Sequence, residues 1–380
     1  MIYSFTFVIL LVASLLKNDR VLVVLLCLPV VYTHPVIFNW DLYPNVDIAL
    51  AMMTIPAFLL LRVKKDRLFS SDLFCRPSTI GLRNFFLISF AASSLFIELT
   101  TGLSDFFFNK LRAGQEYETF SRVIILWYAS GALFAVFQWH TGHGRSRLAV
   151  MIPVFLFILS GDRTQPMLIL MVIFCLGYCQ QKLTFKVYLA SGVFACLLLI
   201  GKTLYIFLLT GIWTLTFTPF GNAIGYSESV SLMHYAELSF EHSSNLDFYL
   251  HRVFLVILPI SFTDIHVFQN EYKDTFFSDW SYSAGAGGNI ISEIYWSLGW
   301  IGFLLSGGLY VFLISLLASK RWNIFGVLWP ILVVFFSFYI WCNSLFSMIS
   351  HEKKFIYILL LGVFFLSLKS LLIKKGESNL

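Results

Sequence analysis

Charged residues are scarce in this chain of 380 residues. Asp, Glu, Lys and Arg together make up 12% of it, against about a quarter in a typical soluble domain, whereas hydrophobic residues make up 58%. No linker rich in proline, glycine or serine divides the chain, and no repeat or low-complexity tract is present. The composition therefore excludes a large soluble domain and predicts an integral membrane protein.

The sequence also lacks the short motifs that mark several kinds of catalytic site. No Asp-x-Asp, Walker loop, GxSxG or HExxH sequence occurs, which argues against a metal-dependent nucleotide-sugar transferase. The six cysteines include no CxxC pair, so they indicate neither a disulfide framework nor a thiolate metal site. The net charge of +5 is no sign of nucleic-acid binding, because the basic residues gather in loops beside apolar runs. We expect no metal, no cofactor and no nucleic-acid partner.

Apolar runs close to membrane-spanning length follow one another along most of the chain. A helix needs about 20 residues to cross a hydrocarbon core of about 30 Å. We therefore expect an all-α polytopic membrane protein with about 11 transmembrane helices (10–12). The expected spans are 2–16, 21–36, 46–61, 85–103, 123–140, 148–160, 167–180, 187–208, 289–318, 324–342 and 355–373.

The distribution of Lys and Arg predicts which loops face the cytoplasm. The loop 62–83 carries six of them, and cytoplasmic loops are enriched in these residues. Counting spans from that loop places residues 209–288, here called the island, on the extracytoplasmic face with most of the acidic residues. The predicted parts are an N-terminal bundle of about eight spans (1–208), the island with an interfacial or re-entrant helix (209–288), and about three C-terminal spans (289–380). The other loops predicted to be cytoplasmic hold Lys17 and Arg20, Arg145 and Arg147, Lys182 and Lys186, Lys320 and Arg321, and Lys374 and Lys375.

Arg163 lies in a short connector, residues 161–166, between two of the shortest expected spans. Runs of about 13 or 14 residues reach only about 20 Å, so the connector should lie below the membrane surface. An arginine at that depth costs at least about 2.5–3.5 kcal/mol, and it needs an anion or a wet cavity. The alternative is a local pair with Asp162 that only closes a turn.

Two further cationic segments are expected on the extracytoplasmic face. His251 and Arg252 lie near the middle of the apolar segment 248–260, which is too short for a confident span. The guanidinium of Arg252 suits phosphate oxygens, whereas the alternative is a side chain that extends to lipid headgroups. Arg112 lies near Lys110 in a second basic cluster, which could equally be a solvated loop. His251 is one of four island histidines that could accept a proton, although a structural role is the alternative.

The island returns to the membrane through a glycine-rich segment that ends at Asn289. Glycines allow the backbone to approach a ligand or a neighbouring helix closely. Glu293 follows at the outer end of the expected span 289–318, where an ionised carboxylate needs a partner. Arg163 or Arg252 is the partner that we predict. The alternative is that Glu293 only stabilises the start of the helix.

The layout and two local motifs resemble the O-antigen polymerase family, the Wzy-type polymerases of oligosaccharide repeat units. The likeness covers nearly the whole chain: many spans, abundant phenylalanine and one large late extracytoplasmic loop. Its local motifs are the connector 161–166 and the re-entry, in which Glu293-Ile294-Tyr295 is followed by Gly299-Trp300-Ile301-Gly302. The Arg-x10-Gly repeat of some family members is absent here.

The resemblance implies a bacterial inner-membrane glycosyltransferase of GT-C-like architecture whose active site faces the periplasm. Donor and acceptor would be oligosaccharides linked to undecaprenyl diphosphate, and a Wzz-type chain-length regulator and a flippase would be possible partners. The rival functions are an O-antigen ligase, which uses the same donor, and a lipid-linked oligosaccharide flippase. The predicted catalytic residues are His251 and Glu293, and the predicted substrate- or diphosphate-binding residues are Arg163, Arg252, Arg112 and Asn289.

Overall fold

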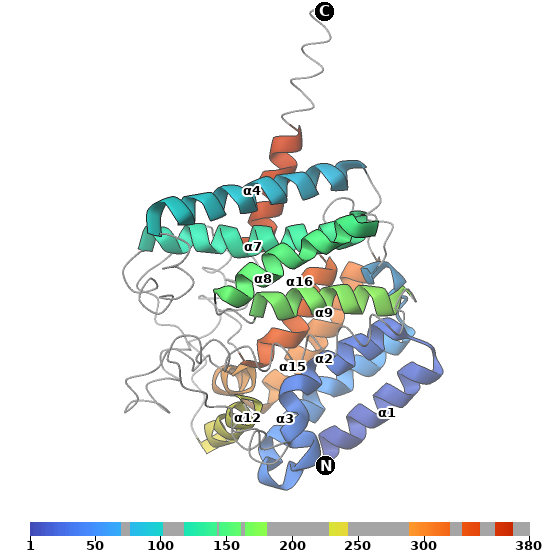
Figure 1. Cartoon of the computed structure of the whole chain (residues 1–380). Helices are drawn as coiled ribbons and strands as arrows, with labels where there is room; N and C mark the ends of the chain where they lie inside the picture. Colours follow the sequence, from blue (N-terminus) through green and yellow to red (C-terminus); the bar gives the residue numbers. More distant parts are fainter. Residues whose placement is uncertain are drawn as a thin grey trace, which may run out of the picture. The chain divides into compact units, whose positions relative to one another are not determined.

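The part of the chain that the structure describes is helical throughout. The computed structural model describes residues 1–69, 77–101, 118–142, 144–160, 164–180, 228–241, 289–319, 329–342 and 354–367, and no strand occurs among them (Figure 1). Among the described residues, five helices are long and apolar enough to cross a membrane. The prediction of a helical membrane protein is therefore confirmed. The five helices are Arg20–Phe38, Pro44–Arg62, Thr79–Thr100, Val123–Thr141 and Ile290–Ala318.

Helices occupy the predicted apolar runs wherever the structure describes them, and the run 187–208 lies wholly outside the described residues. Shorter apolar helices occur at Ile2–Leu16, Gln165–Cys179, Trp329–Phe338 and Lys354–Ser367. The apolar runs thus locate the helices well, and within the part of the chain that the structure describes, five helices have the length of a full span.

Two compact units make up the chain, and each draws on distant parts of the sequence. The first unit comprises 1–69, 217–321 and 332–352, and the second comprises 70–216, 322–331 and 353–380. This grouping by contact differs from the predicted division in chain order, because the first three helices associate with helices from beyond residue 217.

The first unit contains α1, α2, α3, α12, α15 and most of α16. Helix α3 contacts both α1 and α15, and α12 lies against α2. Short 3-10 helices extend α3, α12 and α16. The bounds are α1 Ile2–Leu16, α2 Arg20–Phe38, η1 Trp40–Leu42, α3 Pro44–Thr54, η2 Ile55–Arg62, η3 Asp66–Phe69, α12 Glu228–Leu238, η6 Ser239–Glu241, α15 Ile290–Ser319, α16 Trp329–Tyr339 and η10 Ile340–Cys342.

Two of the predicted cytoplasmic loops meet at one end of this unit, here called the basic end. Lys65 is 2% exposed, and its Nζ lies 2.7 Å from a carboxylate oxygen of Asp19 and 2.7 Å from the Val63 carbonyl oxygen. Asp19 also accepts a hydrogen bond from the Leu22 amide and so caps the start of α2. Lys17 donates to the Leu61 carbonyl at 3.3 Å. These contacts bring residues 17–20 and 62–65 together, as the positive-inside pattern predicts for two loops on one face.

The opposite end of the first unit is here called the island end. The Asp47 carboxylate, 4% exposed, accepts from the amides of Ile2 at 2.8 Å and Tyr3 at 3.1 Å. The first turn of α1 is therefore fixed to the first turn of α3, because Asp47 satisfies amides that have no partner within their own helix. The Tyr3 hydroxyl continues this contact to Thr33 of α2, 3.0 Å away.

The second unit contains α4 Pro77–Thr101, α7 Glu118–Thr141, η5 Gly144–Val150, α8 Met151–Leu159, α9 Thr164–Cys179 and the helix Lys354–Ser367. Trp127 on α7 lies at its centre, fully buried, between the rings of Phe90 and Phe157 at centroid distances of 5.6 and 4.9 Å. Its indole N–H donates to the Ser94 hydroxyl at 2.8 Å, which satisfies the polar edge of an otherwise apolar core.

Basic side chains of the second unit also share one end. Arg83 on α4 donates to the Thr141 hydroxyl at 3.3 Å, where α7 ends. Arg147, six residues further along the chain, donates to the Gly142 carbonyl and lies over the Trp139 ring. Two loops predicted to be cytoplasmic, 62–83 and 141–147, therefore meet in this unit as well.

Candidate functional site

The described part of the island, α12 with η6, is attached to the start of α3. The Glu237 carboxylate accepts from the Asn45 amide at 3.1 Å, from the Asn45 side-chain amide at 2.6 Å and from the Val46 amide at 2.9 Å. Helix α3 begins at Pro44, and the preceding N-cap residue, Tyr43, makes no side-chain hydrogen bond to the helix amides. Glu237 therefore supplies the missing acceptor, and its negative charge lies where the helix dipole favours it.

Tyr43 is nearly buried beside this contact, with 5% of its surface exposed. Burial raises the pKa of the Tyr43 hydroxyl above its ordinary value of 10.0. A tyrosine hydroxyl is protonated at neutral pH even without a shift, and this burial favours the protonated form further. The negative charges described at the island end therefore belong to carboxylates and not to an ionised tyrosine.

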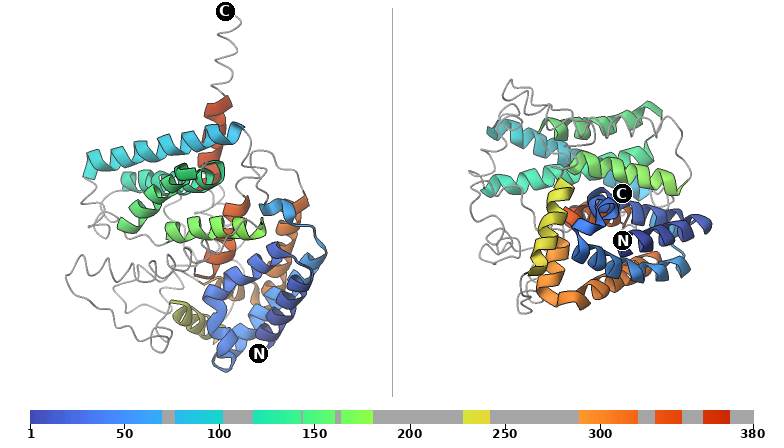
Figure 2. Two further views of the ribbon diagram at one scale, coloured as in Figure 1. Left: turned by 45° about the vertical axis from the view of Figure 1, so that its right-hand side comes forward. Right: turned by 90° about the horizontal axis from the view of Figure 1, so that it is seen from below.

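The start of α15 lies alongside α12 in a parallel pair (Figure 2, right-hand view, where α12 is yellow and α15 orange). The side-chain amide of Asn289 donates to the Leu232 carbonyl at 3.0 Å, and the Trp296 indole N–H donates to the Ser239 carbonyl at 3.0 Å. Both pairs are separated by 57 residues, so the two segments advance together in the same direction over about two helical turns. The described segment of the island, 228–241, is thus held by both α3 and α15.

Gly299 divides α15 into two pieces. Its φ of 61° and ψ of −156° are non-helical and belong to a region that is essentially restricted to glycine. The second piece, 300–319, is about 30 Å long at 1.5 Å per residue, which equals the hydrocarbon thickness. The first piece, 290–298, is about 13 Å long and changes direction at the break (Figure 2). The predicted span 289–318 is therefore a broken helix, and a single piece of it has spanning length.

The short first piece of α15 concentrates buried polar side chains. Asn289 and Ser292 are fully buried, Glu293 is 3% exposed and Ser297 is 2% exposed. The Ser297 hydroxyl donates to the Glu293 carbonyl at 2.6 Å, and the Ser292 hydroxyl has no hydrogen-bond partner among the described residues. Burying polar groups in this number is costly, and ionisable residues buried in membrane helices mark functional sites by default. Glu293 is the ionisable member of this group.

Asn289 has an identifiable structural role. Its side-chain amide donates to Leu232, and its side-chain oxygen Oδ1 accepts from the Ile291 amide at 2.8 Å. The Asn289 side chain therefore caps α15 while it holds α12. Its predicted contact with a substrate stays a prediction. Glu293 lies one turn further on, where its amide donates to the Asn289 carbonyl at 3.0 Å. The structure therefore places these two predicted site residues on successive turns of one short helix.

An aromatic cluster covers the break in α15. The ring of Phe240 from η6 lies 4.5 Å from Tyr295, 5.0 Å from Trp300 and 6.1 Å from Phe303, centroid to centroid. Tyr295 and Phe303 come from either side of Gly299. The cluster therefore fixes how the two pieces of α15 meet, and it ties the break to the island.

The four other predicted site residues, Arg112, Arg163, Arg252 and His251, lie outside the described residues. The helices on either side of the connector 161–166 are longer than the apolar runs predict. Helix α9 has 16 residues, and η5 with α8 extends from Gly144 to Leu159. At helical rise these segments reach about 24 and 27 Å, closer to the hydrocarbon thickness of about 30 Å than the length of about 20 Å expected from the apolar runs.

Glu237 and Ser292 are candidate residues that the sequence analysis does not single out. Glu237 contacts residues 191 and 192 positions earlier, a separation that no local pattern encodes. A usable signal is the start of α3, because Pro44 preceded by Tyr43 leaves helix amides without a local acceptor. Within the described ranges, no group of three or more His, Cys, Asp or Glu side chains is placed to hold a metal ion.

The site at the island end thus consists of a buried carboxylate on a broken membrane helix, held in place by a segment of the island. Such a carboxylate can accept a proton from a hydroxyl group, and the nearby break provides an irregular backbone of the kind that lines membrane binding sites. Comparisons with protein-family models, with curated proteins and with solved structures find no match for this chain.

Proposed function

We propose that this protein polymerises lipid-linked oligosaccharide repeat units at the periplasmic face of a bacterial inner membrane. In this proposal the chain has about eleven spans in a GT-C-like arrangement, and the island end faces the periplasm. The donor is a glycan on undecaprenyl diphosphate, and the acceptor is a single repeat unit on a second undecaprenyl diphosphate.

The proposed reaction is a glycosyl transfer without metal or nucleotide. The acceptor hydroxyl oxygen attacks the anomeric carbon of the donor and forms the new glycosidic bond. The bond between that carbon and the diphosphate oxygen breaks, and undecaprenyl diphosphate leaves with the electron pair. The hydroxyl proton passes to a base on the protein. The protein must therefore hold two lipids, stabilise the negative charge of the leaving diphosphate and accept one proton.

Glu293 is the residue that we propose as proton acceptor, with His251 as the other candidate. A positioned base contributes about 10²–10⁴-fold to such a transfer. We assign the diphosphate to Arg163, Arg252 and Arg112, because guanidinium groups offer paired donors to phosphate oxygens, where negative charge develops in the transition state. Asn289 positions the helix that carries Glu293.

One observation carries this proposal: the buried carboxylate of Glu293 lies on the short piece of a broken helix, at the end of the first unit where the described segment of the island, 228–241, is attached. The basic loops 17–20 and 62–65 lie at the opposite end of that unit, which favours an extracytoplasmic island end by the positive-inside rule. A reaction on lipid-linked sugars in the outer leaflet needs its base at that end, close to the membrane surface.

The test is a gel of surface lipopolysaccharide from a strain that lacks only this gene. The proposal predicts core that carries a single repeat unit, with the ladder of longer chains lost and then restored by the intact gene. Polymer that accumulates on undecaprenyl diphosphate, with bare core, would instead identify a ligase. Repeat units held on the cytoplasmic leaflet would identify a flippase, and an unchanged ladder would contradict all three functions.

A further inference from the structure

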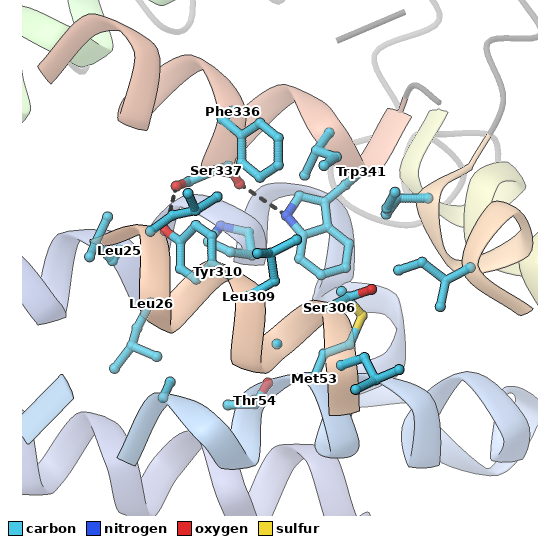
Figure 3. Close-up of a pocket in the computed structure, with 18 of the residues that line it drawn as sticks. Leu25, Leu26, Met53, Thr54, Ser306, Leu309, Tyr310, Phe336, Ser337 and Trp341 are labelled. Carbon is cyan, nitrogen blue, oxygen red and sulfur yellow. Dashed lines mark hydrogen bonds between the residues drawn. The ribbon is translucent and has the colours of Figure 1, made fainter. Parts of the chain in front are cut away.

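An apolar cavity of about 420 Å³ lies within the first unit, between α15 and the helices α1, α2, α3 and α16 (Figure 3). Ligand pockets commonly measure about 300–1,000 Å³, so this volume accommodates part of one lipid chain rather than a whole lipid. Gly307 sets one wall, because a Cβ there would lie 2.3 Å from the Met53 carbonyl oxygen. Glycine therefore lets α15 pack closely against α3 at this point. The cavity lies beside this contact between the two helices.

The polar side chains that line the cavity are almost all engaged with the protein. The Tyr310 hydroxyl lies 2.8 Å from the Ser337 hydroxyl, and the Trp341 indole N–H donates to the Ser337 carbonyl at 3.0 Å (Figure 3). Thr54 donates to the carbonyl of Leu50. Among the described lining residues none is charged, and Ser306 alone offers a half-buried hydroxyl without an identified bond. The lining thus suits a hydrocarbon occupant and offers no partner for an ion.

The cavity opens sideways, toward the lipid. Leu305, Leu309 and Leu313 line it and are also 56%, 58% and 43% exposed. They recur every four residues on the spanning piece of α15 and so form one stripe along the helix. A wall that faces both the cavity and the bilayer is a lateral opening, and a molecule that enters there comes from the hydrocarbon phase.

The same cavity reaches the candidate functional site. Ile290, Ile294 and Leu298 line it from the first piece of α15, the piece that carries Glu293. A lipid chain in the cavity would therefore have its headgroup at the island end, beside the helix of the buried carboxylate. Any phospholipid could supply a chain, but this continuity favours the lipid on which the site acts.

We propose that this cavity holds the polyprenyl chain of one lipid-linked substrate, entering laterally past the leucine stripe of α15. The proposal rests on the proposed function for the identity of the lipid. It assigns a substrate-positioning role to helices α1, α2, α3 and α16, none of which carries a predicted catalytic residue.

The test is photolabelling of the full-length protein in lipid nanodiscs. One probe is a prenyl diphosphate with a diazirine in its chain, and the other is a phosphatidylglycerol with a diazirine in an acyl chain. Peptide mass spectrometry maps the labelled residues. We expect the prenyl probe to label the segments around Ser306 and Phe336, and unlabelled polyprenyl diphosphate to displace it.

A pair of variants controls for bulk. Ser306→Leu fills the cavity and should lower prenyl labelling by about tenfold, equivalent to about 1.4 kcal/mol. Gly308→Leu introduces the same side chain on the same helix and adds more bulk, but at a position where a Cβ would meet no atom within 4 Å, and it should leave labelling unchanged. The map obtained with the unsubstituted protein stands even if Ser306→Leu fails to fold.

Three results would overturn the proposal: no label in the cavity, equal labelling of the cavity by the phosphatidylglycerol probe, or full labelling of a folded Ser306→Leu variant. Labelling does not require glycan transfer, so the two proposals can fail separately. A labelled cavity with an unchanged lipopolysaccharide ladder in the deletion strain overturns the polymerase function. A lost ladder with an unlabelled cavity overturns the cavity proposal alone.

Discussion

Replacement of Glu237 by alanine should release α12 from the membrane helices. Its carboxylate accepts three hydrogen bonds from Asn45 and Val46 at 2.6–3.1 Å and lies at the positive end of α3. A hydrogen bond to a charged group contributes about 1.5–3 kcal/mol, and a charge at a helix terminus about 0.3–1 kcal/mol. Because Glu237 is only partly buried and water can replace some of these bonds, we expect a loss of about 2 kcal/mol in the local stability of α12.

Amide hydrogen exchange measures this loss directly. If the free energy of local opening falls by about 2 kcal/mol, amide exchange becomes about 30-fold faster. We expect this in peptides that cover residues 228–241 and the first turn of α3. Glu241→Ala is the matched control, since it removes the same charge from the exposed end of the same segment. Equal exchange in the two variants would refute the role that we assign to Glu237. A double variant with Asn45→Ala should be less destabilised than the sum of the two single variants.

Two further substitutions test the break in α15 and the basic end by thermal unfolding in detergent. Gly299→Ala should destabilise by about 1–3 kcal/mol, because alanine must adopt the φ of 61° or straighten the helix. Gly308→Ala should be neutral or stabilising, and equal effects of the two would contradict a required break. Lys65→Met should cost about 3 kcal/mol by leaving Asp19 without its 2.7 Å partner, whereas Lys64→Met, at an exposed position, should cost little. A Lys65→Met protein as stable as the parent would refute the buried ion pair.

The helices were predictable from the sequence because their signal is local. Apolar runs locate them closely, and α1 at Ile2–Leu16 coincides with the expected range 2–16. The grouping of basic residues was predictable for the same reason. The exception is Lys65, expected in a basic loop and found 2% exposed, because its amine reaches Asp19 and nearby carbonyls.

The contacts that build the candidate site were not predictable in this way. The apolar run continues through Gly299 without a change in composition, so hydropathy alone does not reveal the break. The bonds from Glu237 to α3 and from Asn289 to Leu232 join residues 57 to 192 positions apart. Glu293 was predictable as a site residue because a carboxylate stands out in an apolar run, and its burial in the structure agrees with that reasoning.

The most direct test of the proposed function compares two variants in the deletion strain. Glu293→Gln keeps the size and polarity of the buried side chain but removes the proton acceptor, and Glu241→Gln makes the same change at an exposed position of the island. Lipopolysaccharide gels, read with immunoblots for equal amounts of protein in the membrane, measure the ladder. We predict that Glu241→Gln restores the full ladder and that Glu293→Gln lowers polymerisation by at least about 100-fold and leaves core with a single repeat unit. A full ladder from Glu293→Gln would contradict the assignment of this carboxylate as the base.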